Sequence, residues 1–494
     1  MMCTSTATRC QWPRSRSPRT ARCLQTPTVR SPTPDTDFVG NDTFTYTLTD
    51  GTLTSQATVT ITVNAPADDH DEATEDTATL ITLTGGDTGT GSASGTFKIT
   101  GDRDMFRLTV SDGELSINLD GINGLDTSLR VYDSTGTEIA SNDDGGPGFS
   151  SALTIDFSAG TYYISAGSFN DASTGDFTID VAHRALVTST FQQGVDGYAG
   201  TQDTYLTGDY ANSTYDDWTI AKIDLAGSGK HEHTLLQFDS LFGSGTGQIP
   251  YGSEITSATL TFYVSNSGDQ FTMHRMLTNW DNNATFNSFG SGIQADGIEA
   301  MITPDVTSAS YVSSGWTDLD VTASLAAWAT APESNFGWAM LPTDTNSVQF
   351  YTSDNVSYWV PRISVDYLSP NGDLHSNTPD ATATPLDLSS GTATTLGTFE
   401  AAGDRDLFQF TVTQSTTITI DLGWTGAGSF VDTYLRLYDG AGTQIAFDDD
   451  GGSGTSGLNS RLTITLGPGT YFVSAGSFAD GDSGDFVMNL SVVQ

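Results

Sequence analysis

The chain has 494 residues, enough for about three or four domains, and its 60 acidic and 18 basic side chains give it a formal charge of −42. A surface this negative repels phosphate backbones and anionic bilayers, and the sequence holds no long apolar run, so we expect no nucleic-acid partner and no membrane insertion. With 52 glycines and 16% charged residues, the composition predicts an all-β, multidomain chain of tandem β-sandwich or jelly-roll modules.

The first 34 residues differ in composition from the rest. All 3 cysteines lie here together with several arginines, and the first acidic residue is Asp35. No apolar segment of the kind found in signal peptides follows the basic start. We interpret residues 1–34 as a disordered or mistranslated leader, and the alternative is a basic tail for an anionic partner.

Residues 35–66 carry a hairpin pattern. Apolar residues alternate with polar ones from Phe44 to Leu48 and from Ala57 to Val63, and an Asp-Gly pair separates the two runs. The segment resembles the last two strands of bacterial cadherin-like repeats. Because so few residues cannot build a core of their own, we expect the remnant of a cadherin-like, Ig-type β domain.

Two later segments repeat each other. Four blocks recur in the same order, and the differences in length fall between the blocks. Such a pattern indicates a duplicated module. The matched pairs are 101–106 with 403–408, 126–133 with 432–439, 142–146 with 448–452, and 160–169 with 469–478.

These repeated blocks resemble the bacterial pre-peptidase C-terminal domain, which we expect at residues 67–183 and 371–494. The resemblance implies a small, usually non-catalytic β-sandwich attached to secreted peptidases and other exported proteins. Relatives include collagen-binding domains of secreted collagenases, in which the linker and an early loop hold calcium.

Residues 187–368 form a different module. Its motifs include the runs 191–206, 235–239 and 249–260, followed by Asp320-Val321-Thr322 and 335–338. In this order they resemble the DNRLRE-type module, related to family 96 carbohydrate-binding modules, although Phe286 stands where tryptophan is usual. The resemblance implies a jelly roll of secreted polysaccharide-active or surface proteins, and relatives bind acidic polysaccharide.

Acidic loops in both repeats predict calcium sites. Ca²⁺ takes six to eight oxygen ligands, and two aspartates separated by one residue after a glycine turn can converge on an ion. The approach segment of the first copy has four carboxylates where the second has one, so we expect tighter binding in the first copy. The predicted ligands are Asp68, Asp69, Asp71, Glu72, Asp102 and Asp104 in the first copy and Asp373, Asp404 and Asp406 in the second.

Two alternatives to calcium remain open for these loops. Aspartates beside glycine are common in turns, where they accept backbone hydrogen bonds, and Arg103 or Arg405 could supply the counter-charge. A second pair of acidic loops, 142–146 and 448–452, fits a solvated turn as well as a minor calcium site. Adjacent acids on one loop do not match the facing carboxylates of glycosidases.

Aromatic residues concentrate in the middle module, which holds six of the 8 tryptophans. Flat sugar faces pack on indole rings, so exposed aromatics with neighbouring amides are typical of glycan binding. Trp328 and Trp338 fit core positions instead. The predicted ligand-binding residues are Trp218, Trp280, Tyr351 and Trp359.

No catalytic motif is present. His231 and His233 have a spacing that zinc could use, but the sequence shows no third ligand, and an exposed polar strand face is favoured. No nucleophile, base and orienting group can be assembled from a local motif. We therefore expect a non-enzyme.

Together these patterns predict a secreted or cell-surface protein that binds polysaccharide or extracellular matrix through the middle module, between calcium-stabilised sandwiches. Two alternatives remain. The chain could be the accessory C-terminal region of a secreted hydrolase whose catalytic region lies upstream, rather than part of an adhesin. In the second alternative, the middle module itself cleaves polysaccharide.

Overall fold

The computed structural model describes most of the chain after residue 37. The described ranges are 8–9, 24–25, 38–49, 53–64, 68–70, 77–84, 86, 88–226, 230–243, 245, 247–355, 358–370, 379, 383–399, 404–425, 431–452 and 457–493. Within them, no helix has the length and apolar character needed to cross a membrane. Strands dominate throughout, so the predicted all-β class is confirmed.

The N-terminal segment contains the predicted hairpin. Strand β3 (Gly40–Thr49) pairs antiparallel with β4 (Thr54–Val63), so that Phe44 lies opposite Val59. Alternate residues of β4 are exposed and half-buried, as expected for strands with one partly covered face. A short pair, β1 (Thr8–Arg9) and β2 (Leu24–Gln25), precedes the hairpin.

The first repeat is a sandwich of two sheets. One sheet has the order β10-β9-β12-β7-β5, and the facing strands run β11-β8-β13 with β6 beside β13. Inward residues such as Phe106, Ile117 and Phe177 form its buried core. The strands are β5 (Thr79–Leu80), β6 (Gly89–Phe97), β7 (Arg103–Val110), β8 (Gly113–Gly121), β9 (Thr127–Tyr132), β10 (Glu138–Asn142), β11 (Ser151–Phe157), β12 (Gly160–Ser168) and β13 (Gly175–Gln192).

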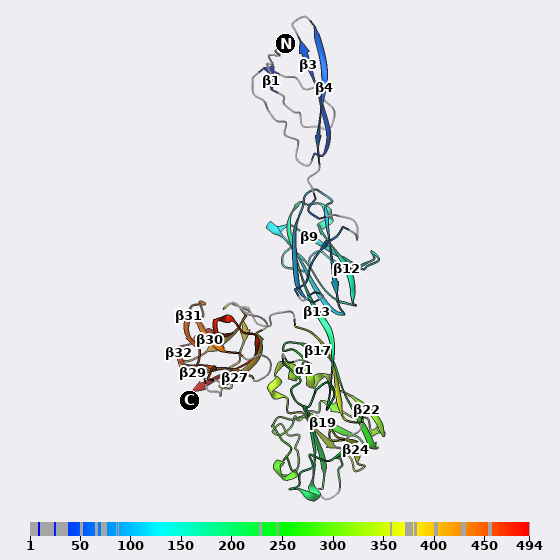
Figure 1. Ribbon diagram of the computed structural model, residues 1–494, viewed down its shortest axis with the longest axis vertical. Helices are drawn as coiled ribbons and strands as arrows, with labels where there is room; N and C mark the ends of the chain where they lie inside the picture. The colour runs from blue at the N-terminus through cyan, green and yellow to red at the C-terminus, as the bar shows by residue number, and fades with distance from the viewer. Residues whose placement is uncertain are drawn as a thin grey trace.

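The second repeat has the same strand order, with sheets β26-β28-β33-β30-β31 and β27-β34-β29-β32 (Figure 1). In both copies the short first strand pairs parallel with the strand that carries the Asp-Arg-Asp motif. The duplication is therefore structural as well as sequential. The strands are β26 (Thr384–Pro385), β27 (Thr392–Phe399), β28 (Arg405–Val412), β29 (Thr416–Trp424), β30 (Thr433–Asp439), β31 (Gln444–Asp448), β32 (Ser460–Leu466), β33 (Gly469–Ser477) and β34 (Gly484–Val493).

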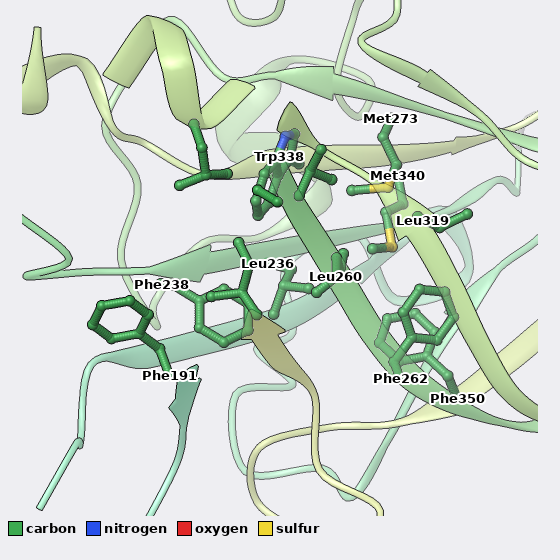
Figure 2. Close-up of a cluster of buried hydrophobic side chains, with 14 of the residues drawn as sticks. Phe191, Leu236, Phe238, Leu260, Phe262, Met273, Leu319, Trp338, Met340 and Phe350 are labelled. Atoms are coloured by element: carbon green, nitrogen blue, oxygen red, sulfur yellow. The ribbon is translucent and has the colours of Figure 1, made fainter. Parts of the chain in front are cut away.

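The middle module is a separate two-sheet sandwich. One sheet has the order β14-β16-β23-β19-β20, and the other runs β13-β25-β17-β24-β15 with β22 on β17. Figure 2 shows its apolar core, in which Phe262 and Trp338 are fully buried. The strands are β14 (Thr201–Thr207), β15 (Ile220–Ile223), β16 (Glu232–Phe238), β17 (Glu254–Asn266), β19 (Phe271–Arg275), β20 (Val306–Thr307), β22 (Gly315–Asp320), β23 (Trp338–Pro342), β24 (Val348–Tyr351) and β25 (Arg362–Leu368).

A short helix, α1 (Thr322–Thr330), covers part of this core. Its Trp328 packs against Trp338 with ring centroids 4.7 Å apart, so the core positions predicted for these two tryptophans are confirmed. A small pair of strands, β18 (Gly268–Asp269) and β21 (Tyr311–Val312), completes the module.

Strand β13 belongs to both the first sandwich and the middle module. Its first half pairs with β6 and β8, and from Leu186 onward it pairs with β25. Just before this change of partner, Arg184 forms ion pairs with Glu114 and Glu254 and donates a hydrogen bond to the Ser369 carbonyl at 3.0 Å. The expected boundary between residues 183 and 187 therefore falls inside one continuous strand.

Candidate functional site

A buried carboxylate marks the acidic site of the first sandwich. Asp104 lies on β7 and is 0% exposed, and among the described residues neither of its oxygens has a hydrogen-bond partner. Carboxylate oxygens of Asp68, Asp69 and Asp104 all lie within 4.8 Å of one another. Buried charges are ordinarily paired or bound to a metal, so this arrangement fits a divalent cation.

The approach segment is held against the sandwich by its own hydrogen bonds. Asp69 accepts a hydrogen bond from the Thr96 backbone N–H at 2.9 Å and forms an ion pair with Lys98 at 2.5 Å. The ring of His70 contacts Thr79 at 2.8 Å and the Ser94 carbonyl at 3.0 Å. These contacts place the two exposed acids over Asp104, where they could serve as ligands of an ion.

The electrostatics of this cluster favour a bound cation or proton. Burial, followed by the negative charges of Asp69, Asp102 and Asp68, raises the pKa of Asp104 to about 8. Burial also acts to raise the pKa of Asp69, but hydrogen bonds and the charge of Lys98 outweigh it and lower that pKa. Lys98 thus neutralises Asp69 in part, and its weaker effect on Asp104 does not offset burial and the neighbouring negative charges.

Space for the carboxylate comes from a glycine on β6, in the facing sheet. A Cβ atom at Gly95 would lie 2.7 Å from the Asp104 Oδ2 atom and 2.6 Å from the Phe177 ring. Because real Cβ contacts are essentially never this close, a side chain at this position would force the carboxylate and the ring to shift. The glycine therefore leaves room for the Asp104 carboxylate.

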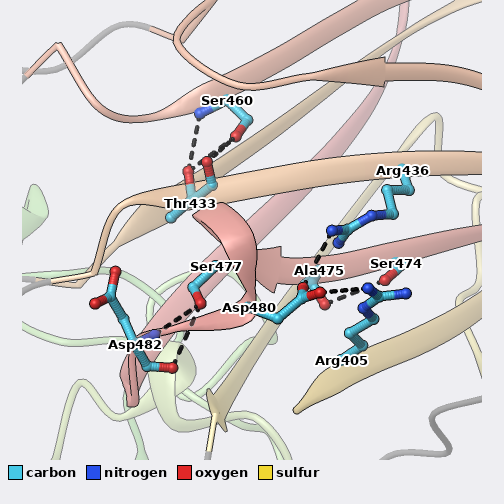
Figure 3. A network of polar contacts seen from close by, with 9 residues as sticks. All are labelled: Arg405, Thr433, Arg436, Ser460, Ser474, Ala475, Ser477, Asp480 and Asp482. Atoms are coloured by element: carbon cyan, nitrogen blue, oxygen red, sulfur yellow. Dashed lines mark hydrogen bonds and ion pairs between the residues drawn. The ribbon is translucent and has the colours of Figure 1, made fainter. Parts of the chain in front are cut away.

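The arginine that follows Asp102 does not supply the counter-charge. Successive strand residues face opposite ways, and Arg103 forms an ion pair with Asp171 at 2.7 Å. In the second copy Arg405 and Arg436 both pair with Asp480 (Figure 3). In the first copy Arg103 therefore pairs with Asp171 and not with Asp104, so the alternative in which Arg103 neutralises that buried aspartate is wrong.

The other predicted calcium ligands have different outcomes. Asp102 is buried and accepts the Lys98 backbone N–H at 2.5 Å, which makes it a turn residue beside the cluster. Asp404 and Asp406 occupy the equivalent turn in the second copy, and Asp406 is fully buried. Three predicted ligands lie outside the described residues: Asp71, Glu72 and Asp373.

In the second sandwich a different set of acids converges. Oxygens of Asp432, Asp449 and Asp450 lie within 4.8 Å of one another, and burial followed by the two neighbouring charges raises the pKa of Asp432. In the first copy Asp126 occupies the corresponding place, and burial raises its pKa too. Sequence reasoning had located the 448–450 loop but not Asp432, whose signal was its recurrence in both copies.

Exposed aromatic rings gather on the outer face of the middle module. Trp359 stacks on Tyr263 and Tyr351, with centroids 4.9 and 5.1 Å apart and interplanar angles of 23° and 18°. Because both tyrosines contact the indole at a small angle, Trp359 covers them, and it remains 40% exposed. This stack brings the predicted residues Tyr351 and Trp359 together.

A second indole stands beside this stack. Trp316 on β22 is 46% exposed and meets Tyr263 at an interplanar angle of 85°. The Arg362 guanidinium lies 4.9 Å from the centroid of its ring, a cation–π contact. Together, Tyr263, Trp316, Tyr351, Trp359 and Arg362 form what we call the aromatic face. Sequence reasoning missed Tyr263, Trp316 and Arg362.

The two tryptophans expected in polar loops differ from each other. Trp280 is 6% exposed, and its indole N–H donates to the Phe336 carbonyl at 2.8 Å, so the expected exposed position was wrong. Trp218 is exposed, and its ring meets Tyr205 and Tyr215 edge-on.

The histidine pair does not form a metal cluster with other described residues. His233 is buried rather than on an exposed strand face, and its Nδ1 atom accepts the Ile293 backbone N–H at 3.1 Å. Burial, together with the neighbouring His231, lowers the pKa of His233 to about 4. Among the described residues, the two convergent ligand groups contain aspartates alone.

Known protein families match segments of the chain on both sides of the middle module. The family of the bacterial pre-peptidase C-terminal domain matches residues 102–168 and 404–477, and that of a bacterial Ig domain matches residues 19–62. The chain therefore carries two pre-peptidase C-terminal domains and a bacterial Ig domain. These are non-catalytic accessory domains, and no catalytic domain is evident.

The matches also bear on the sequence interpretation. The Ig match begins inside residues 1–34 and supports the Ig-type domain predicted for residues 35–66. Both family matches lie outside 187–368, so the carbohydrate-binding resemblance of the middle module rests on its sequence motifs. No curated protein matches the chain.

Solved structures similar to the chain include two β proteins. The pre-peptidase C-terminal domain of the collagenase from Bacillus anthracis is 18% identical, with 24% of this chain and 100% of that chain covered and a TM-score of 0.19. A triple jelly-roll protein of an archaeal virus turret is 12% identical, with 92% and 89% covered and a TM-score of 0.13.

Proposed function

We propose that this chain is a non-catalytic region of a secreted or cell-surface protein that binds polysaccharide through its middle module. In this proposal the first sandwich binds Ca²⁺ and is stiffened by it. The Ig and pre-peptidase C-terminal domains support an extracellular accessory role. An adhesin and the accessory region of a secreted hydrolase are both compatible with this role.

The aromatic face is the observation that carries the proposal. Apolar rings cost free energy when they face water, yet Trp316 on β22 and Trp359 in the turn before β25 remain 46% and 40% exposed, and both contact Tyr263. Because the Trp359 indole is stacked on Tyr263 and Tyr351, its orientation is restricted. Such a preorganised surface can stack on the C–H face of a sugar ring with little loss of side-chain entropy.

Calcium would act on the first sandwich rather than on the ligand. Asp68, Asp69 and Asp104 would hold the ion, which would neutralise the buried carboxylate and fasten the approach segment to β7. Through the continuous strand β13, that sandwich is joined to the module that carries the aromatic face. Calcium would therefore stiffen the support of the binding surface.

The binding proposal is tested by applying the full chain to an array of immobilised polysaccharides in a calcium-containing buffer. We expect retention on at least one polysaccharide, and a loss of at least tenfold in affinity for Trp359→Ala, which is about 1.4 kcal/mol. Trp218→Ala examines the other exposed indole, and Tyr210→Ala removes an exposed aromatic residue away from the aromatic face.

The outcomes separate the candidate surfaces. Loss in Trp359→Ala with retention in Tyr210→Ala supports the aromatic face, whereas loss confined to Trp218→Ala moves the site to that indole. Retention of no polysaccharide by the wild-type chain contradicts the proposal. New reducing ends in the wells would overturn the non-catalytic assignment.

A further inference from the structure

The strands around the aromatic face present a broad polar surface. Along β25, Ile363 and Val365 point into the core, so Arg362, Ser364 and Asp366 point outward. Strand β22 alternates in the same way, with Leu319 in the core and Trp316 and Asp318 exposed. In Figure 1, β22 and β24 lie together on one side of the module.

Hydroxyl and amide groups continue this surface next to the rings. Thr190 on β13 and Ser364 on β25 have hydroxyls 3.4 Å apart, and Gln192 donates to the Val360 carbonyl at 3.4 Å. These groups combine donors and acceptors on neutral side chains. They match the hydroxyl groups of a sugar chain that extends from the rings across β25 and β13.

The charged groups on this surface are mostly negative. Asp318 is exposed and accepts the Thr261 hydroxyl at 2.7 Å, while Asp366 accepts the Thr188 hydroxyl at 2.5 Å. Asp320 is a second exposed acid on β22. Arg362 is a basic group beside the rings, where it lies over Trp316. A carboxylate on each sugar would meet like charges, in a chain whose formal charge is −42.

We propose that the ligand of the aromatic face is an uncharged, hydroxyl-rich polysaccharide, and that acidic polysaccharides are excluded. The inference rests on the proposed polysaccharide binding and adds the class of ligand. It departs from the acidic ligands that the sequence resemblance implied. Sugar rings would stack on Trp359 beside Trp316, the Arg362 guanidinium would donate to neutral hydroxyls, and Asp318 and Asp366 would accept from them while repelling uronates or sulfates.

The test presents the full chain with neutral and acidic polysaccharides on the same array. The neutral set contains glucans, galactans, mannans, xylans and methyl-esterified pectin, and the acidic set contains alginate, sulfated galactan and de-esterified pectin. We expect every retained polysaccharide to be neutral. Binding should change less than twofold between low and high NaCl, because contacts with an uncharged ligand are not screened.

A charge variant supplies an independent measurement. Asp318→Asn removes a negative charge from the proposed surface, and Asp296→Asn removes one from an exposed loop between β19 and β20. For a neutral ligand, Asp318→Asn should not strengthen binding of the retained polysaccharide more than Asp296→Asn does, and any new binding of acidic polysaccharide should be greater in Asp318→Asn than in Asp296→Asn.

Each result has a defined meaning. Retention of acidic polysaccharides that weakens steeply with salt overturns the neutral ligand but leaves the proposed function standing. If the wild-type chain retains an acidic polysaccharide and Asp318→Asn binds it more tightly, the neutral-ligand inference is also overturned and the proposed function still stands. Retention of neither set overturns both the inference and the proposed function.

Discussion

The first sandwich and the middle module each bury an aspartate, but different groups surround the two carboxylates. Asp104 is 0% exposed, neither of its oxygens has a partner among the described residues, and two exposed acids lie over it. Asp203 on β14 is 3% exposed, but one of its oxygens accepts the Ser353 backbone N–H at 2.8 Å. Only the first belongs to a convergent group of carboxylates among the described residues.

The comparison shows that neighbours, more than burial, decide what a buried carboxylate needs. Burial is the main cause that raises the pKa of Asp104 to about 8 and that of Asp203 to about 7. Three further negative charges add to the shift at Asp104, whereas at Asp203 hydrogen bonds from Ser353 oppose the shift and the one added negative charge is that of Asp354. A divalent cation suits the site with several carboxylates, and a proton suits the site of Asp203.

The largest expected effect concerns the proton at Asp203. Because its pKa is raised in the folded state, the neutral form stabilises the fold at low pH, and this contribution is lost as the pH rises toward 7. Between pH 5 and 8 the loss should reach about 3 kcal/mol. Asp203→Asn should remove it, which calorimetric unfolding of the full chain at several pH values would measure.

The matched control for this variant is Asp296→Asn, which replaces an exposed aspartate of the same module. It should keep the pH dependence of the wild-type chain. If Asp203→Asn and the wild-type chain lose stability in parallel as the pH rises, Asp203 is ionised throughout and the contrast with Asp104 fails.

The next effect concerns calcium in the first sandwich. Calcium at about one hundred times its dissociation constant should stabilise this domain by about 2.7 kcal/mol, because the ion binds the folded state. Asp104→Asn should abolish the gain without destabilising the metal-free protein, since the variant removes a buried charge that has no partner. Thermal unfolding with and without calcium or chelator measures both quantities.

Asp156→Asn is the control, because Asp156 is an exposed residue of β11 in the same sandwich. It should retain the full calcium response. An unchanged calcium response in Asp104→Asn would show that the ion, if it binds, does not use the buried carboxylate.

The smallest expected effect concerns the competition between Lys98 and calcium for Asp69. The Lys98 ammonium lies 2.5 Å from the Asp69 Oδ1 atom and competes with calcium for that oxygen. Lys98→Met should therefore raise calcium affinity roughly threefold, in keeping with the modest strength of exposed ion pairs. Lys230→Met, which removes a lysine paired with Asp209, should leave calcium affinity unchanged. Weaker calcium binding in Lys98→Met would indicate that Lys98 organises the site instead.

Sequence patterns predicted the strand framework better than the surfaces. Alternation and the internal repeat were sufficient for the sandwiches because they reflect which side chains enter a core. Trp280 was misplaced because polar neighbours in sequence did not reveal that its N–H reaches the Phe336 carbonyl. Tyr263 and Trp316 were missed because their contact depends on the register between β17 and β22.

The acidic cluster of the first sandwich also shows what sequence spacing can and cannot predict. The spacing of Asp102 and Asp104 directed attention to one turn, but strand alternation sends the intervening arginine to Asp171 on the other side. The orphaned oxygens of Asp104 result from packing beside Gly95, which no spacing in the sequence records.

The most direct test of the central claim is a calorimetric titration of calcium into the metal-free full chain and its Asp104→Asn variant at the same pH. The account predicts that the variant binds one calcium ion fewer than the wild-type chain. Identical titrations, or no heat of binding in either protein, would contradict it.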